Sequence, residues 1–288
     1  MKPAPFEYQA PATLREAIDL LAADPEAVVI AGGQSLMPVL AFRLAMPSML
    51  VDLRRVQGLG NIAIGDGGVR LGARVRWRDI EDDDRLEIAH PLLREAITHV
   101  AHYPIRNRGT VGGSLAHADP AAELPGIAVT CDAEIILVGA AGSRTVRAGQ
   151  FFTGPLSTLR QPGEIITELR LPLWPADRRW AFREFAQRQG DFALAGIAHF
   201  YDEDQQGRVS NAHVGVIAAC DRPHRLTEVE ALLNGHQIDD GLIREAAAAA
   251  AQSVDPPEDL HAGAAYRRGL VATLVERGLR AAAQNRGA

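Results

Sequence analysis

The spacing of apolar side chains predicts a helix at the start of the chain. Leu14, Ile18 and Leu21 fall on one helical face, and Thr13 with Glu16 has the spacing of a capping box. The same reasoning predicts further helices at 35–44, 91–100, 121–131, 227–233, 239–253 and 264–283. The alanine run 246–251 is typical of a tightly packed helix face.

Short apolar runs bounded by glycine and proline predict strands. These runs lie at 27–31, 49–53, 61–64, 69–73, 133–138, 143–146, 180–187, 192–201 and 209–219. The first two flank a helix, and the next four form two hairpins across glycine turns. Trp174-Pro175-Ala176-Asp177 resembles a domain boundary, so the last three runs predict a separate antiparallel meander.

Composition narrows the class of protein. The chain has 288 residues and a net charge of −6, and its basic residues are scattered, which excludes nucleic acid as the main partner. We expect no membrane span and no signal peptide, because no apolar run is long enough and the N-terminus has no apolar core. The expected location is the cytoplasm.

The cysteines are too few for a metal cluster. Cys131 and Cys220 lie far apart in the sequence, and an iron–sulfur cluster normally takes four ligands. No zinc-binding spacing is present. We expect two small buried thiols and no metal site.

Two glycine segments are the candidate ligand site. Ala31-Gly32-Gly33-Gln34-Ser35 follows a predicted strand, and Thr110-Val111-Gly112-Gly113-Ser114 precedes a predicted helix. Glycine lets backbone N–H groups approach a ligand, and successive N–H groups form an anion site. The two segments predict one long phosphate-bearing ligand held from two sides. The fingerprint G-x-G-x-x-G with a distant acid is absent, which argues against a nicotinamide-binding Rossmann domain.

Polar residues around these segments have two readings each. Ser35, Thr110 and Ser114 either contact the ligand or cap helices. Asp119 is expected to cap a helix that has Pro120 at its first position and Glu123 in its first turn. The branched side chain of Gly112→Val or Gly32→Val should block the ligand and leave most of the fold intact.

The two segments resemble the FAD loops of a known family. Together with 107–125, 151–154, 164–166 and 190–193, they are similar to the medium subunit of xanthine-oxidase-type molybdenum hydroxylases. The resemblance is greatest to the flavoprotein subunit of aerobic carbon monoxide dehydrogenase and its relatives. It extends over nearly the whole chain.

The resemblance implies an α+β fold of the PCMH/CO-dehydrogenase-flavoprotein type. Residues 1–176 would form an FAD-binding domain with subdomains at about 1–58 and 59–176. Residues 177–288 would form a C-terminal domain with a small three-stranded antiparallel sheet and a helix cluster. The FAD would lie in the cleft between the two subdomains.

The resemblance also implies the function and the partners. A large molybdopterin subunit would oxidise the substrate, and a small subunit would carry 2Fe–2S clusters, in a dimer of heterotrimers. This chain would take the electrons on FAD and pass them to an external acceptor. We expect no catalytic residue, because the cofactor supplies the chemistry. The alternatives are a stand-alone FAD-dependent oxidoreductase and an FAD-dependent assembly or sensor protein. The substrate and the acceptor remain open.

The resemblance implies a set of cofactor-binding positions. Glu123, Leu159 and Arg183 fall where relatives contact FAD, and Phe192 falls where relatives bring a side chain near the isoalloxazine ring. The alternative is that Phe192 packs in the hydrophobic core. Val100 replaces an aromatic residue of some eukaryotic relatives. The expected cofactor-binding residues are Ile30, Ala31, Gly32, Gly33, Gln34, Ser35, Leu36, Thr110, Val111, Gly112, Gly113, Ser114, Glu123, Leu159, Arg183 and Phe192.

Overall fold

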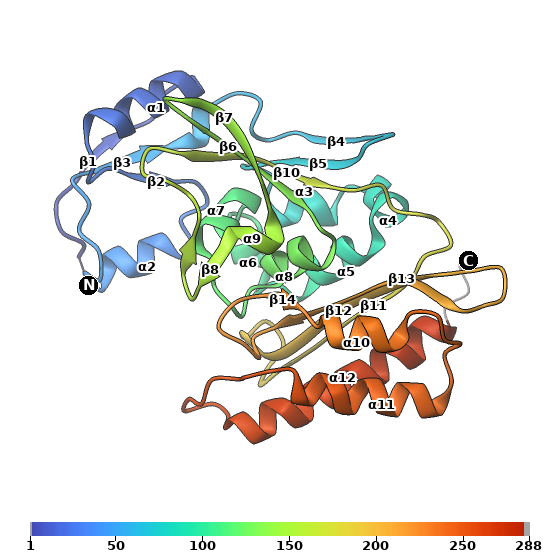
Figure 1. Ribbon diagram of the computed structural model, residues 1–288. Coiled ribbons are helices and arrows are strands. Elements are labelled where there is room, and N and C mark those ends of the chain that lie inside the picture. Colours follow the sequence, from blue (N-terminus) through green and yellow to red (C-terminus); the bar gives the residue numbers. More distant parts are fainter. Residues whose placement is uncertain (1, 285–288) are drawn as a thin grey trace.

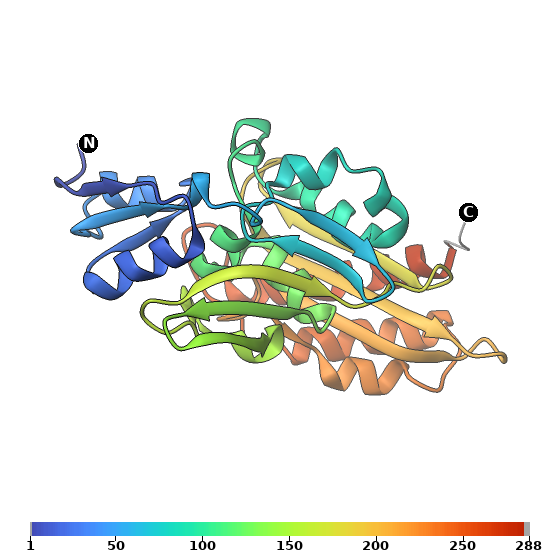
Figure 2. The ribbon, with the colours of Figure 1, turned by 90° about the horizontal axis from the view of Figure 1, so that it is seen from above.

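The computed structural model describes residues 2–284 and has an α+β architecture in layers. Helices of the middle of the chain lie between a five-stranded sheet and a four-stranded sheet, and the C-terminal helices cover the outer face of the latter (Figure 1). Figure 2 shows the small N-terminal sheet at one end of the molecule.

The N-terminal part is a parallel three-stranded sheet with order β1-β3-β2. Thr13 and Glu16 form the predicted capping box, which fixes the start of the first helix. The elements are β1 (Glu7–Gln9), α1 (Leu14–Ala23), β2 (Val28–Ile30), α2 (Leu36–Ala41), β3 (Met49–Asp52) and the 3-10 helix η1 (Leu53–Arg55).

The middle part pairs five antiparallel strands in the order β4-β5-β10-β6-β7. The strands are β4 (Ile62–Gly65), β5 (Gly68–Gly72), β6 (Glu134–Gly139), β7 (Gly142–Arg147) and β10 (Ile165–Leu171). The helices are α3 (Trp77–Glu81), α4 (Arg85–Ala89), α5 (Pro91–His99), α6 (Tyr103–Arg106), α7 (Val111–His117), α8 (Glu123–Thr130) and α9 (Ala148–Phe151). A small hairpin, β8 (Phe152–Gly154) and β9 (Ser157–Thr158), follows.

The C-terminal sheet has four strands, so the prediction of three was wrong. The missed strand is β14 (His224–Arg225), which follows β11 (Arg179–Ala186), β12 (Ala193–Glu203) and β13 (Val209–Ile217). Two residues are too short for an alternating pattern, and β14 is defined by its pairing with Gly215 and Val216. The helices are α10 (Thr227–Leu233), α11 (Asp240–Gln252) and α12 (Ala264–Gln284).

Helix α8 joins the middle part to the C-terminal sheet, and all of its residues are buried. Gly126 on this helix faces Ile217 of β13, and Gly215 of β13 faces Thr130 at the end of the helix. A Cβ atom at either glycine would overlap the opposite side chain. The two glycines therefore let the helix and the strand approach closely.

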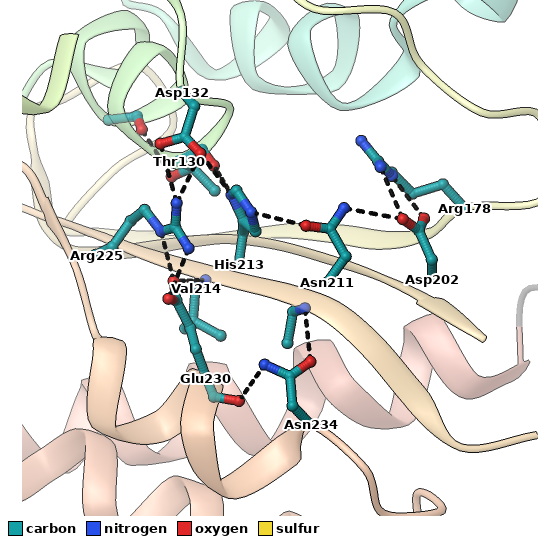
Figure 3. A network of polar contacts seen from close by, with 12 residues as sticks. Thr130, Asp132, Arg178, Asp202, Asn211, His213, Val214, Arg225, Glu230 and Asn234 are labelled. Carbon is teal, nitrogen blue, oxygen red and sulfur yellow. Dashed lines mark hydrogen bonds and ion pairs between the residues drawn. The ribbon is translucent and has the colours of Figure 1, made fainter. Parts of the chain in front are cut away.

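A network of polar contacts closes the same junction (Figure 3). The His213 ring donates from Nδ1 to the Thr130 carbonyl at 2.7 Å. Arg225 binds Asp132 on the middle part and Glu230 on α10, at 2.8 Å and 2.7 Å. The Glu230 carboxylate also accepts the backbone N–H of Val214 at 2.8 Å. These charge-assisted bonds orient the C-terminal sheet against α8.

Two local predictions were wrong. Residues 111–114 form the first turn of α7 and not a loop. Helix α8 begins at Glu123 rather than near Pro120, because the Asp119 carboxylate accepts the N–H of Ala121 at 2.9 Å and holds a turn there. Such local side-chain bonds to the backbone compete with helix formation.

Candidate cofactor site

One large cavity runs along the chain's two glycine segments. Its volume is about 2160 Å³, well above the roughly 300–1,000 Å³ of pockets for drug-sized ligands. Its wall includes Ile18 and Val28 of the N-terminal part, Gly113 of α7, and Pro256 and His261 of the C-terminal part. A cavity with walls from three parts of the chain suits a long ligand.

The first glycine segment connects β2 to α2. Gly33 has φ of 74°, a left-handed conformation that favours glycine. A Cβ atom at Gly32 would overlap the carbonyl of Arg108, so the segment touches the turn before α7. Ser35 lies at the N-cap position of α2 but makes no capping hydrogen bond.

The backbone N–H groups of residues 32–35 donate to no backbone or side-chain acceptor within the described chain. They lie in the cavity wall, where unpaired donors attract an anion. The first segment therefore has the donors that a pyrophosphate requires.

The second segment works differently from its predicted role. The backbone N–H groups of Val111 and Gly112 donate to carbonyls of Val75 and Ala73 at 2.9 Å and 2.8 Å. The N–H of Gly113 donates to the Thr110 hydroxyl at 3.2 Å, so Thr110 caps α7. These N–H groups are used within the protein, and the segment offers a close-approach surface instead of an anion cradle.

The glycines of the two segments differ in what they face. A Cβ atom at Gly112 would lie 2.6 Å from the Cβ of Ala73, whereas the nearest neighbour at Gly113 would be the Thr110 hydroxyl at 2.9 Å. Gly113 is exposed to the cavity. A branched residue at Gly32 or Gly112 would press on backbone or Cβ atoms of the protein as well as on the ligand, which argues against the expectation that it leaves most of the fold intact.

Glu123 brings a buried carboxyl to the cavity wall. It is the first residue of α8 and is 7% exposed. Burial is the main cause that raises the pKa of Glu123 to about 7; Asp119 adds to the rise, and a backbone hydrogen bond and His99 oppose it. A carboxyl that is largely neutral below pH 7 repels an adjacent anionic ligand less than a fully ionised one does.

Most of the predicted site residues lie around this one cavity. The cavity-lining members are Ile30, Ala31, Gly32, Gly33, Gln34, Ser35, Leu36, Thr110, Gly112, Gly113, Ser114, Glu123 and Phe192. Three others lie outside this lining: Val111 is fully buried, Leu159 is 44% exposed, and Arg183 donates to the Phe182 carbonyl. Cofactor contact at each of these positions stays a prediction.

Sequence reasoning missed the wall that the C-terminal part provides. The lining residues of this segment are Asp255, Pro256, Pro257, Asp259 and His261, and Arg267 links the segment to the sheet. Its guanidinium donates to the Leu194 carbonyl and to Asp259, both at 2.7 Å. In the sequence, Pro256-Pro257 indicates only a loop before the last helix. The tertiary structure is needed to show that this loop reaches the cavity.

Comparison with known proteins identifies the family. Residues 4–174 match the model described as the FAD binding domain in molybdopterin dehydrogenase, and residues 180–282 match the CO dehydrogenase flavoprotein C-terminal domain. The chain belongs to the FAD-binding medium subunits of molybdenum hydroxylases. Its cofactor is FAD, and the class is oxidoreductase.

Relatives match this medium subunit over nearly its full length. The 6-hydroxypseudooxynicotine dehydrogenase complex subunit alpha of Paenarthrobacter nicotinovorans is 39% identical, over 97% of this chain and 95% of that protein. The carbon monoxide dehydrogenase medium chain of Hydrogenophaga pseudoflava is 32% identical, over 98% of each. A solved structure of carbon monoxide dehydrogenase from the same organism has a TM-score of 0.96 at 34% identity and covers 100% of both chains. The crystal structure of quinoline 2-oxidoreductase from Pseudomonas putida 86 has a TM-score of 0.95 at 39% identity and covers 100% of both chains.

The residues present fit FAD. The cavity is long enough to span three parts of the chain, the first segment has free N–H donors for a pyrophosphate, and the second permits close approach. Among residues 2–284, no group of three His, Cys, Asp or Glu side chains is placed to hold a metal ion. No helix in that range is long and apolar enough to cross a membrane.

Proposed function

We propose that this medium subunit transfers electrons within a three-component enzyme. It takes them from 2Fe–2S clusters of a small partner subunit and passes them from FAD to an external acceptor. A large molybdopterin subunit oxidises the substrate, in a dimer of heterotrimers. The observation that carries the proposal is the full-length similarity to proteins that are themselves named as subunits or medium chains.

The cysteine content supports an external source of electrons. The chain has two cysteines, Cys131 and Cys220, and both are buried as free thiols. Two thiols cannot supply the four ligands of a cluster, so the electrons reach FAD from another chain. The proposal includes a cytoplasmic location, where thiols stay reduced, and cell fractionation tests it.

The chain's own residues bind and orient the cofactor. Backbone N–H groups of residues 32–35 would hold the pyrophosphate, and Gly113 would let the ligand lie against α7. Phe192, which is 71% exposed at the cavity, would contact the ring system. Bound FAD supplies the redox chemistry, and the protein supplies orientation and electrostatics.

Purification of the native complex tests the proposal. An affinity tag on the C-terminus of this chain, in the source cell, should recover two further subunits, with molybdenum, iron and FAD in the eluate. A matched preparation of the chain expressed without partners should contain FAD but no molybdenum or iron. Recovery of the chain alone from the source cell, with turnover of a substrate, would favour the stand-alone FAD-dependent oxidoreductase.

A further inference from the structure

Strand β11 carries a carboxyl oxygen that is buried without a hydrogen bond among the described residues. This oxygen is the Oε2 atom of Glu184. Alternation along the strand turns Trp180, Phe182 and Glu184 toward the middle part of the chain. An ionised carboxylate buried without a partner is expensive, so this environment favours the neutral acid.

Glu184 points to the first turn of α8. A Cβ atom at Gly196 would lie 3.7 Å from Cγ of Glu184 and 3.2 Å from Cβ of Ile217. The Ile217 side chain in turn occupies the space beside Gly126. Gly126 follows Glu123 by three residues, and residues so spaced share a helix face. Glu184, Gly196 and Ile217 are paired in a row across the sheet, so Glu184 lies on the face that α8 covers, and the charge of Glu123 acts on it.

We propose that Glu184 and Glu123 form a buried acid pair that shares a proton at the wall of the cofactor cavity. Glu123 faces the cavity, and Glu184 is the positioning residue that sets the charge of Glu123. Two buried carboxyls that meet cannot both ionise cheaply, which is the general basis of proton sharing between acids. The inference rests on the binding of FAD in this cavity and extends the proposed electron-transfer function.

The electrostatic environment supports the pair. Burial, the larger cause, and the charge of Glu123 together raise the pKa of Glu184 to about 8. Burial likewise raises the pKa of Glu123 to about 7.

Two other side chains act on the ionisation of Glu123. They are His99 on α5, which lies beside Glu95, and Asp119 before α8. Arg183 is next to Glu184 in the sequence, but its side chain leaves the opposite face of β11 and packs against α12. The strands β12 and β13 contribute Gly196 and Ile217, which carry no charge. His99 favours ionisation of Glu123 and Asp119 opposes it, and burial is the largest effect on both members of the pair.

The consequence concerns the electrons on the cofactor. While the pair holds its shared proton, it places at most one negative charge beside the cavity. Once the pair is fully ionised, a second negative charge opposes the addition of electrons to bound FAD. The FAD midpoint potential should therefore fall more steeply with pH in the range where the pair ionises.

The test uses the full chain loaded with FAD and the variants Glu184→Gln, Glu123→Gln and Glu203→Gln. Glu203 is the matched control, because it lies in the same sheet but pairs with Arg179 at 3.0 Å. Infrared spectra from pH 6 to 9 measure the protonated carboxyl band. Redox titration with mediators over the same range measures the midpoint potential. Neither readout needs partner subunits, so failure here is distinguishable from failure of the electron-transfer proposal.

The expected result is a protonated carboxyl in wild type that ionises between pH 7 and 8, together with a bend in the potential. In Glu184→Gln the band should be lost at pH 7 and the bend should move down by about one pH unit or more, since the neighbouring acid no longer repels the charge. Glu123→Gln should lose the bend, and Glu203→Gln should behave as wild type. Absence of the protonated band in wild type, or an unmoved bend in Glu184→Gln, would overturn the proposal.

Discussion

Alanine substitutions at two adjacent glycines separate a packing role from a ligand role. At Gly112 the added Cβ would lie 2.6 Å from the Cβ of Ala73, well inside the roughly 3.5–4.0 Å of a carbon–carbon contact. At Gly113 the added Cβ would meet only the Thr110 hydroxyl and would project into the cavity. We expect Gly112→Ala to weaken the fold and Gly113→Ala to weaken FAD binding.

The magnitudes follow from the contacts. Overpacking costs about 1–3 kcal/mol, and neither side of the Gly112–Ala73 contact has a side chain that can rotate away. Because the contact is rigid, the cost lies in the upper half of that range, about 2–3 kcal/mol. The helix propensity of alanine returns up to about 1 kcal/mol, leaving a net loss of about 1–3 kcal/mol in the free energy of unfolding. For a chain of this size, that is roughly 2–12 °C in melting temperature. At Gly113 the added methyl group would crowd the ligand and not the protein. A cost of the same size there would weaken FAD binding about tenfold or more.

The assay compares FAD-free and FAD-loaded protein. Thermal melting of the FAD-free form measures the stability of the chain, and flavin fluorescence on dilution measures affinity. Gly113→Ala should melt within about 1 kcal/mol of wild type without FAD, yet release FAD more readily. If Gly113→Ala binds FAD as wild type does, the second segment does not face the cofactor. If Gly112→Ala keeps full stability, the close contact with Ala73 is not a constraint.

Three further predictions test other parts of the structure. Arg225→Met should cost about 3 kcal/mol of unfolding free energy, because Glu230 is 5% exposed and would lose its ion pair. The exposed Arg222→Met is its control in urea unfolding, and equal effects would contradict the role of the junction network. Phe192→Ala should change the flavin absorption spectrum and leave the melting temperature of the FAD-free chain almost unchanged, since the side chain is 71% exposed. A large drop in melting temperature would show that Phe192 packs in the core and not against the flavin. In the FAD-free chain, Glu184 has a pKa of about 8 against a usual 4.5, so the unfolded chain ionises first and stability falls as pH rises through that window. Relative to Glu184→Gln, wild type should lose unfolding free energy from pH 5 to pH 8, and a constant difference would show that Glu184 is ionised.

Local signals in the sequence were sufficient to predict most of the helices and strands. The capping box of Thr13 and Glu16 and the glycine turns of the two hairpins act over a few residues, and the structure has them as predicted. Both glycine segments to which the family resemblance drew attention lie in the wall of the one large cavity described above.

Contacts between distant residues were not predictable from local patterns. Gly112 is constrained by Ala73, and Gly32 by the carbonyl of Arg108, so each glycine's role depends on a partner far away in the sequence. The N–H groups of Val111 and Gly112 donate to the carbonyls of residues 75 and 73, and no pattern of glycines in the sequence predicts these bonds. For the same reason the acid pair and the C-terminal wall of the cavity became visible only in three dimensions.

The most direct test of the electron-transfer role is the flavin absorbance of the FAD-loaded chain under anaerobic conditions. The panel of substrates follows the names of the relatives: nicotine, 6-hydroxypseudooxynicotine, quinoline and carbon monoxide. Dithionite should bleach the flavin of the isolated chain, and none of the substrates should. Addition of the two partner subunits from the native complex should restore bleaching by one of them. Bleaching of the isolated chain by a substrate, in a preparation free of iron and molybdenum, would contradict the account.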